Sequence, residues 1–109
     1  MRIGPFCSAL VLVWFSLVGS VQGQDLQKAR EALDSGNYES ALVVLRPLAE
    51  QGDAEAQFKL GKMYSNGEGV VQDFEEAVKW FRLAAEQGDV RGQYNLGTMY
   101  YNGQGVVQN

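Results

Sequence analysis

The sequence of 109 residues has no histidine and a single cysteine, Cys7. Histidine is the commonest metal ligand and general base in proteins, and a disulfide needs two cysteines. The serines after residue 23, Ser35, Ser40 and Ser65, therefore have no histidine to activate them, and none of them begins a Ser-x-x-Lys motif. We therefore expect no cofactor, no metal site and no enzymatic activity.

Basic residues are also scarce, with nine Lys and Arg against thirteen Asp and Glu, which gives a net charge of −4. A protein that binds nucleic acid needs clustered Lys and Arg to displace counterions from the phosphates. We therefore expect no nucleic-acid partner.

The N-terminus differs in character from the rest of the chain. Arg2 is the only charged residue before Asp25, and the stretch 6–18 is almost wholly apolar. Such a run is short for a bilayer core, which takes about 20 apolar residues, and small residues follow it. The pattern predicts a signal peptide over 1–23, cleaved before Gln24, and a periplasmic or secreted protein with no membrane attachment after cleavage. The alternative is an N-terminal anchor that is kept.

The central feature of the sequence is a repeat with a period of 36 residues. At that offset 49–73 aligns with 85–109, and sixteen of the 25 aligned positions are identical. A fixed period of 20 to 50 residues indicates stacked supersecondary units, none of which can bury its apolar face alone.

Each unit is predicted to contain two helices joined by a loop. In the first, apolar residues recur from Ala56 to Tyr64 at i, i+4, i+7 and i+8, which is one face of a helix. Asp53 can cap its N-terminus, Gly67 can close it in the left-handed conformation, and Asp73 can cap the second helix. The same register predicts helices near 25–35, 38–51, 54–66, 74–87 and 90–102, and no strands.

Three residues within these helices need a physical reason. Gly61 and Gly97 lie in mid-helix, where glycine costs about 1 kcal/mol relative to alanine. We interpret them as points where a neighbouring helix approaches closely, with the ring of Trp80 or Phe81 above them. Pro47 falls inside the second helix and cannot donate a hydrogen bond, so we expect a bend or a weak turn there. The loops with glycines at 67 and 69, and at 103 and 105, are interpreted as tight turns, because they follow helices and lack a phosphate-loop lysine.

The motif resembles the Sel-one-like repeat family, a relative of the tetratricopeptide repeat. The resemblance rests on AQFKLGxMYxNGxGV over 56–70 and DFxxAxxWFxxAAxQG over 73–88. It implies an all-α fold, a right-handed α/α solenoid of helix-loop-helix repeats. The expected divisions are 1–23, the signal peptide; 24–48, an N-terminal helix and half repeat; 49–84, a complete repeat; and 85–109, a truncated repeat.

The resemblance also implies a function, because members of the family are adaptors that present a curved helical surface to protein partners. We expect an interaction module of the bacterial envelope that binds a partner peptide or helix on the concave face. By analogy with tetratricopeptide arrays, that face is formed by Glu55, Phe58, Lys62, Ser65, Asn66, Arg91, Tyr94, Thr98, Tyr101 and Asn102. In the alternative interpretation Phe58 and Tyr94 pack against neighbouring first helices.

The last predicted helix, 90–102, has no following helix to cover Leu96, Met99 and Tyr100. We expect either a fragment of a longer array or a face covered by another molecule, including self-association through this helix. Two other functions stay open: an envelope hydrolase acting on cell-wall material, as proposed for the cysteine-rich branch of the family, and a purely structural fragment. Turnover by the processed chain would favour the hydrolase.

Overall fold

The computed structural model describes residues 23–107, which form five helices and no strand. The first helix occupies 23–34. It is followed by α2 (Tyr38–Glu50), α3 (Ala54–Asn66), α4 (Phe74–Glu86) and α5 (Val90–Asn102). The C-terminal end of the first helix and both ends of α2, α3, α4 and α5 lie within one residue of the predicted ones, so the predicted all-α fold is confirmed. The predicted signal peptide lies outside the described residues except for Gly23.

The helix ends follow from the capping residues that the sequence placed there. Asp53 accepts a hydrogen bond from the N–H of residue 56 at 2.8 Å, and Asp73 and Asp89 accept from the N–H three residues on at 3.1 Å. Gly67 and Gly103 close α3 and α5 with φ of 70° and 67°, the left-handed region that favours glycine. The helix boundaries are therefore set by capping residues close to them in the sequence.

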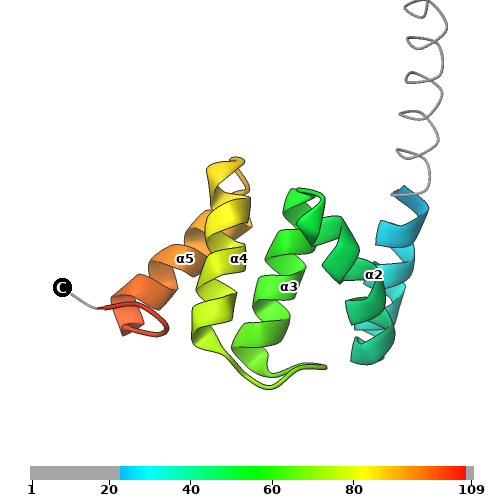
Figure 1. Ribbon diagram of the computed structural model, residues 1–109, viewed down its shortest axis with the longest axis horizontal. Coiled ribbons are helices and arrows are strands. Elements are labelled where there is room, and N and C mark those ends of the chain that lie inside the picture. Colours follow the sequence, from blue (N-terminus) through cyan, green and yellow to red (C-terminus); the bar gives the residue numbers. More distant parts are fainter. Residues whose placement is uncertain (1–22, 108–109) are drawn as a thin grey trace, which may run out of the picture.

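The helices lie side by side in one row, from the first helix and α2 at one end to α5 at the other (Figure 1). Each helix packs on its neighbours in sequence, α2 on α3, α3 on α4 and α4 on α5. This is the nearest-neighbour packing of a right-handed α/α solenoid. Helix α2 continues through Pro47 to Glu50. The proline leaves the carbonyl of Val43 without its helical donor, but Val43 lies on the exposed side of the helix, where water can take that place.

Two hydrophobic clusters form the core, and α3 contributes to both. The first joins the first helix, α2 and α3, and its fully buried members include Ala29, Leu45 and Leu60. The second joins α3, α4 and α5, with Phe81 at its centre, 1% exposed. Helix α3 is consequently packed on both sides, and the groove described below lies along it.

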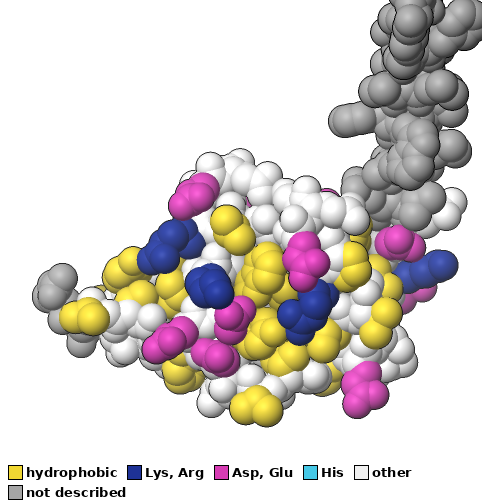
Figure 2. All heavy atoms as spheres, viewed as in Figure 1, with side chains coloured by type: hydrophobic (Ala, Val, Ile, Leu, Met, Phe, Trp, Pro, Cys, Tyr) yellow, Lys and Arg dark blue, Asp and Glu magenta, His cyan; other side chains and the backbone are white. Residues whose placement is uncertain are grey.

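On the face shown in Figure 2, hydrophobic side chains gather over the middle of the row, with basic and acidic side chains dispersed among them. Within residues 23–107, no helix is both long enough and apolar enough to cross a bilayer.

Candidate interaction surface

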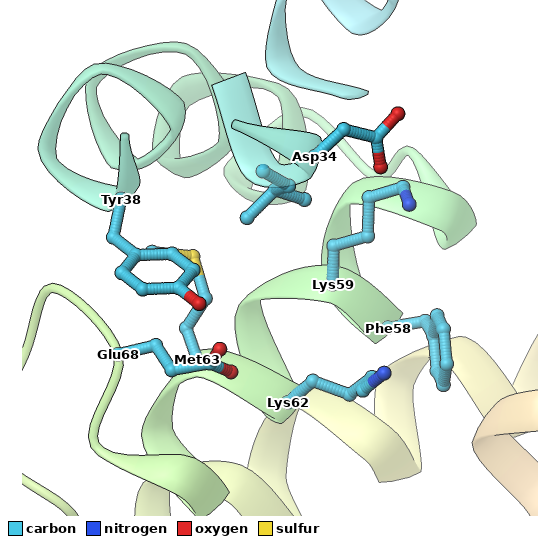
Figure 3. Close-up of a pocket in the computed structure, with 8 residues that line it drawn as sticks. Asp34, Tyr38, Phe58, Lys59, Lys62, Met63 and Glu68 are labelled. Atoms are coloured by element: carbon cyan, nitrogen blue, oxygen red, sulfur yellow. The ribbon is translucent and has the colours of Figure 1, made fainter. Parts of the chain in front are cut away.

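A groove of about 240 Å³ runs along α3 beside the end of the first helix and the start of α2 (Figure 3). Its apolar surface comes from Leu33, Met63 and Phe58, and charged or polar side chains form the rim. The lining residues are Leu33, Asp34, Tyr38, Phe58, Lys59, Lys62, Met63 and Glu68. Five of the eight are charged or polar, so the groove presents more polar than apolar surface and is suited to charge pairing and hydrogen bonding beside a small apolar area.

Glu55 is held in an ion pair beside the groove. The guanidinium of Arg30 donates to both of its carboxylate oxygens, from Nε at 2.8 Å and from Nη2 at 2.6 Å, and the ammonium of Lys59 lies 3.8 Å away. The hydrogen bond from Arg30 holds the pKa of Glu55 below its ordinary value of 4.5, against the opposing effect of burial. Glu55 therefore ties the first helix to α3, and its negative charge is already compensated.

Phe58 is in the core and is not a half-exposed anchor. Its side chain is 9% exposed, and its ring lies 6.1 Å from the ring of Phe81, at an interplanar angle of 42°. The guanidinium of Arg91 lies over the same ring at 4.6 Å and the ammonium of Lys62 at 5.8 Å. Phe58 was interpreted either as a partner-binding anchor or as a residue packed against neighbouring helices. The second interpretation describes its position, because Phe81 of α4 and Arg91 of α5 both contact its ring. Phe58 nevertheless contributes to the lining of the groove.

Of the two mid-helix glycines interpreted as points of close approach, Gly61 is confirmed, whereas the interpretation of Gly97 is wrong for the described residues, because an added Cβ there would meet no atom within 4 Å. A Cβ atom at Gly61 would lie 2.7 Å from two ring carbons of Phe81, closer than real Cβ contacts allow. Phe81, and not Trp80, is the ring above this glycine. The absence of a side chain at Gly61 thus brings α4 close enough to α3 to cover Phe58.

Tyr94, Thr98 and Tyr101 lie apart from the groove. With Gln93 and Gly97 they line a separate, open hollow of about 360 Å³ on α5. Tyr94 is 74% and Tyr101 81% exposed. The ten residues predicted as one concave surface are thus divided between the neighbourhood of the groove and this hollow, which we call the α5 hollow.

Three further predicted residues lie where helices end and loops begin. The amide of Asn66 donates to the carboxylate of Glu68 at 2.9 Å, and the carbonyl of Ser65 accepts from the amide of Gln72 at 2.9 Å. Asn102 lies 3.5 Å from the side-chain oxygen of Gln104. These contacts fix the loops after α3 and α5, so these residues support the groove and the hollow from the side.

Tyr38 and Glu68 line the groove and were missed, because only the first helix of each unit was considered. The hydrogen bond from Asn66 holds the pKa of Glu68 below its ordinary value, and a second bond, from Tyr38, acts in the same direction. A signal for this contact was present at Gly69, where φ is 73° and an added Cβ would lie 2.9 Å from the Cβ of Tyr38. The glycine lets the loop lie against the start of α2.

The expectation that Met99 would be uncovered is wrong. Met99 is 3% exposed, because α4 covers it and Val106 packs against the same cluster from the loop after α5. The hydroxyl of Tyr100 accepts a hydrogen bond from Arg82, although the residue is 43% exposed. The open part of α5 is therefore its Gly97 side.

Across 23–107, no group of three or more His, Cys, Asp or Glu residues has the arrangement that could hold a metal ion. The residues that line the groove offer apolar contact, hydrogen bonds and charge.

The comparisons with known proteins agree with this fold. The family model of the Sel1 repeat matches residues 54–89 and 90–109, so the matched units begin 36 residues apart. Among solved structures, a Sel1 repeat protein from Oxalobacter formigenes is similar to 78% of this chain, with 34% identity and a TM-score of 0.72. A protective antigen present in uropathogenic Escherichia coli strains, which displays an SLR fold, is similar to 83% of it, with 38% identity and a TM-score of 0.71.

The chain spans about a third of the length of the first of these structures and about a fifth of the second, with 34% and 21% covered. No curated protein matches it. The two matches to the family model cover more than half of the chain, including α3, along which the groove lies, and α5. The chain therefore belongs to the Sel1 repeat family.

Proposed function

We propose that this protein is a non-enzymatic adaptor of the bacterial envelope, which binds a peptide or helix of a partner protein in the groove along α3. Sel1 repeats generally mediate protein–protein interaction, and this chain has the fold of the family. Export is supported by the apolar run at 6–18 with Arg2 before it. The two solved structures named above come from bacterial proteins.

The observation that supports the groove most strongly is the pair of lysines on its α3 side. Lys59 lies 3.8 Å from Glu55, whose carboxylate is already bound by Arg30, and Lys62 has no ion pair among the described residues, its ammonium lying over the Phe58 ring. Figure 3 shows both side chains reaching along the groove, Lys62 towards Phe58. An acidic residue of a partner can therefore be bound here without displacing a strong ion pair, while Leu33 provides apolar contact beside it.

This function is tested by crosslinking in cells. A photoreactive amino acid at position 59 should capture a partner from the envelope, whereas one at position 79, on α4, should not. Mass spectrometry of the captured adduct should also show that the chain begins at Gln24, as export with cleavage requires. Adducts formed equally from both positions would contradict the groove.

The dissociation constants of two charge-reversal variants for the captured partner provide a matched comparison. We expect Lys62→Glu to weaken binding about tenfold or more, because it sets two negative charges together. The control is Lys79→Glu, an equal change of charge on α4, where the lysine pairs with Glu76 at 2.9 Å. Binding unchanged by Lys62→Glu, with helix content retained, would refute the proposed groove.

A further inference from the structure

Charge is divided unequally between the two kinds of helix in this chain. Helices α3 and α5, the first helices of their repeats, carry three basic residues and one acidic residue, whereas α2 and α4 carry three basic and five acidic residues. The one acidic residue is Glu55, whose carboxylate Arg30 already binds. In a protein with a net charge of −4, α3 and α5 are therefore locally basic.

The basic residues of α3 and α5 come together around the ring of Phe58. The guanidinium of Arg91 lies 4.6 Å from the ring centroid, and the ammonium of Lys62 lies 5.8 Å from it. One turn earlier on the same face of α3, the carboxylate of Glu55 has two further basic groups around it. The four basic residues, which we call the basic cluster, are Arg30, Lys59, Lys62 and Arg91.

The acidic groups beside the basic cluster are already bound within the chain. Glu55 accepts hydrogen bonds from Arg30, and Asp89 accepts from Arg91 while it also caps the N-terminus of α5. Across the groove, the carboxylate of Glu68 accepts hydrogen bonds from uncharged side chains. These contacts hold the acidic groups in place, so the cations of the cluster are the groups that can take a new partner.

Two cations of the basic cluster are open to such a partner. Lys62 is exposed and has no ion pair among residues 23–107. The side chain of Arg91 pairs with Asp89 but stays 50% exposed, so another molecule can still reach it. Because Lys62 and Arg91 both lie against one ring, about three extended residues, at about 3.3 Å each, reach from one to the other.

We propose that the partner segment bound here carries two acidic residues, roughly two to four positions apart, which bind Lys62 and Arg91. Lys59 adds positive charge, and Leu33 adds apolar contact beside it. An acidic protein segment suits this surface better than a nucleic acid, because the acidic residues of α2 and α4 would repel a long row of phosphates. The inference rests on the proposed function, to which it adds the chemistry of the partner and a contact on α5.

A display library of short random peptides tests this chemistry before the partner is known. The library is selected on the chain as purified from cells and depleted on the double variant Lys62→Glu, Arg91→Glu. It should become enriched in peptides that carry two acidic residues at the proposed spacing. Enrichment of uncharged or basic peptides, or no enrichment, would overturn the proposal. Double-stranded DNA that binds as tightly as the enriched peptides would assign the cluster to nucleic acid.

The affinity of one enriched peptide, measured by fluorescence anisotropy, tests the sign of the interaction. Lys62→Glu should weaken binding about tenfold and Arg91→Gln about threefold, with the helix content of both variants retained. Asp34→Asn should strengthen binding about twofold, because it removes a negative charge that lines the groove and has no ion pair among the described residues.

The matched control is Lys79→Glu on α4, which should leave the affinity for the peptide unchanged. An equal loss of affinity in Lys79→Glu would mean that only the net charge of the protein matters. Weaker binding by Asp34→Asn, or unchanged binding by both Lys62→Glu and Arg91→Gln, would also overturn the proposal.

The photoreactive residue at position 59 separates this inference from the proposed function. A partner captured in cells through an uncharged or basic segment would overturn the inference and leave the adaptor function standing. Acidic peptides enriched from the library, with no partner captured in cells, would support the chemistry of the basic cluster and refute the function proposed in the envelope.

Discussion

At the scale of single residues, Gly61 and Gly97 show how one residue type has opposite energetic consequences at equivalent positions of a repeat. Each lowers helix stability by about 1 kcal/mol relative to alanine. At Gly61 the close packing of Phe81 on the helix offsets that loss, since the ring occupies the place of the missing side chain. At Gly97 nothing in residues 23–107 occupies that place, so the loss is not offset within the described chain.

This difference predicts changes of opposite sign. Gly61→Ala should lower the free energy of unfolding by about 1 kcal/mol, because overpacking costs about 1–3 kcal/mol and the gain in helix propensity is about 1 kcal/mol. Gly97→Ala should raise it by about 1 kcal/mol, since only the propensity changes. Urea unfolding of the two variants beside the unchanged chain measures both values. Two shifts of the same sign would mean that the surroundings of the glycines differ from those described.

The close approach at Gly61 could be predicted from the sequence, because a glycine in mid-helix lowers helix stability and tight packing of a neighbouring helix offsets that loss. The sequence did not decide between the two interpretations of Phe58, because the exposure of a ring depends on how closely α4 and α5 approach, and periodicity does not specify that distance. The position of Arg91 over Phe58 was likewise not predictable, since it needs the angle between neighbouring repeats.

At the scale of elements, the first helix is joined to α3 by a bidentate ion pair between Arg30 and Glu55. Repeats in a solenoid contact only the adjacent repeats, so an ion pair between the first helix and α3 helps to hold the end of the row in place. Because the pKa of Glu55 is lower in the folded protein than its ordinary value of 4.5, the bond stabilises the fold above that pH. The stabilisation is lost as the pH falls through the lower, folded pKa.

We therefore expect a pH-dependent effect of Glu55→Gln. Near neutral pH the variant should be less stable by about 0.5–1 kcal/mol, the range of a partly exposed ion pair. At about pH 3 the difference from the unchanged chain should be smaller, because the carboxylate becomes protonated. Unfolding curves at both pH values provide the measurement, and Arg30→Gln with the double variant shows whether the two residues act together. A difference that does not change with pH would mean that Glu55 contributes by packing alone.

The helices were predictable because caps and apolar period are local signals, present at Asp53, Asp73 and Asp89 in the sequence itself. The path of the loops was not predictable, because the apolar period of a helix does not determine the conformation of the residues that follow it. The groove depends on that path, since Glu68 reaches Tyr38 only through the turn at Gly69.

At the scale of the whole molecule, the row of helices is held together by two clusters that meet at α3. Six residues of α3 are buried, whereas only Gly92 and Met99 are buried in α5. In a linear stack the stability of each unit depends on its own packing and on its nearest neighbours. Helix α5 is covered on its α4 side, while its Gly97 side is open among the described residues, so it should open before α3 does.

Hydrogen exchange of backbone amides tests this order. Amides in the middle of α5 should exchange about tenfold faster or more than those in the middle of α3, because local opening needs less free energy where fewer side chains are buried. The Gly97→Ala variant should slow exchange in α5 and leave α3 unchanged, since the added methyl group favours the helix without touching the α3 cluster. Equal protection of α3 and α5 would mean that the row unfolds as one cooperative unit. In that case the packing of α5 on α4, through the cluster around Phe81 that also buries Met99, would be enough to couple the unfolding of α5 to that of the rest of the row.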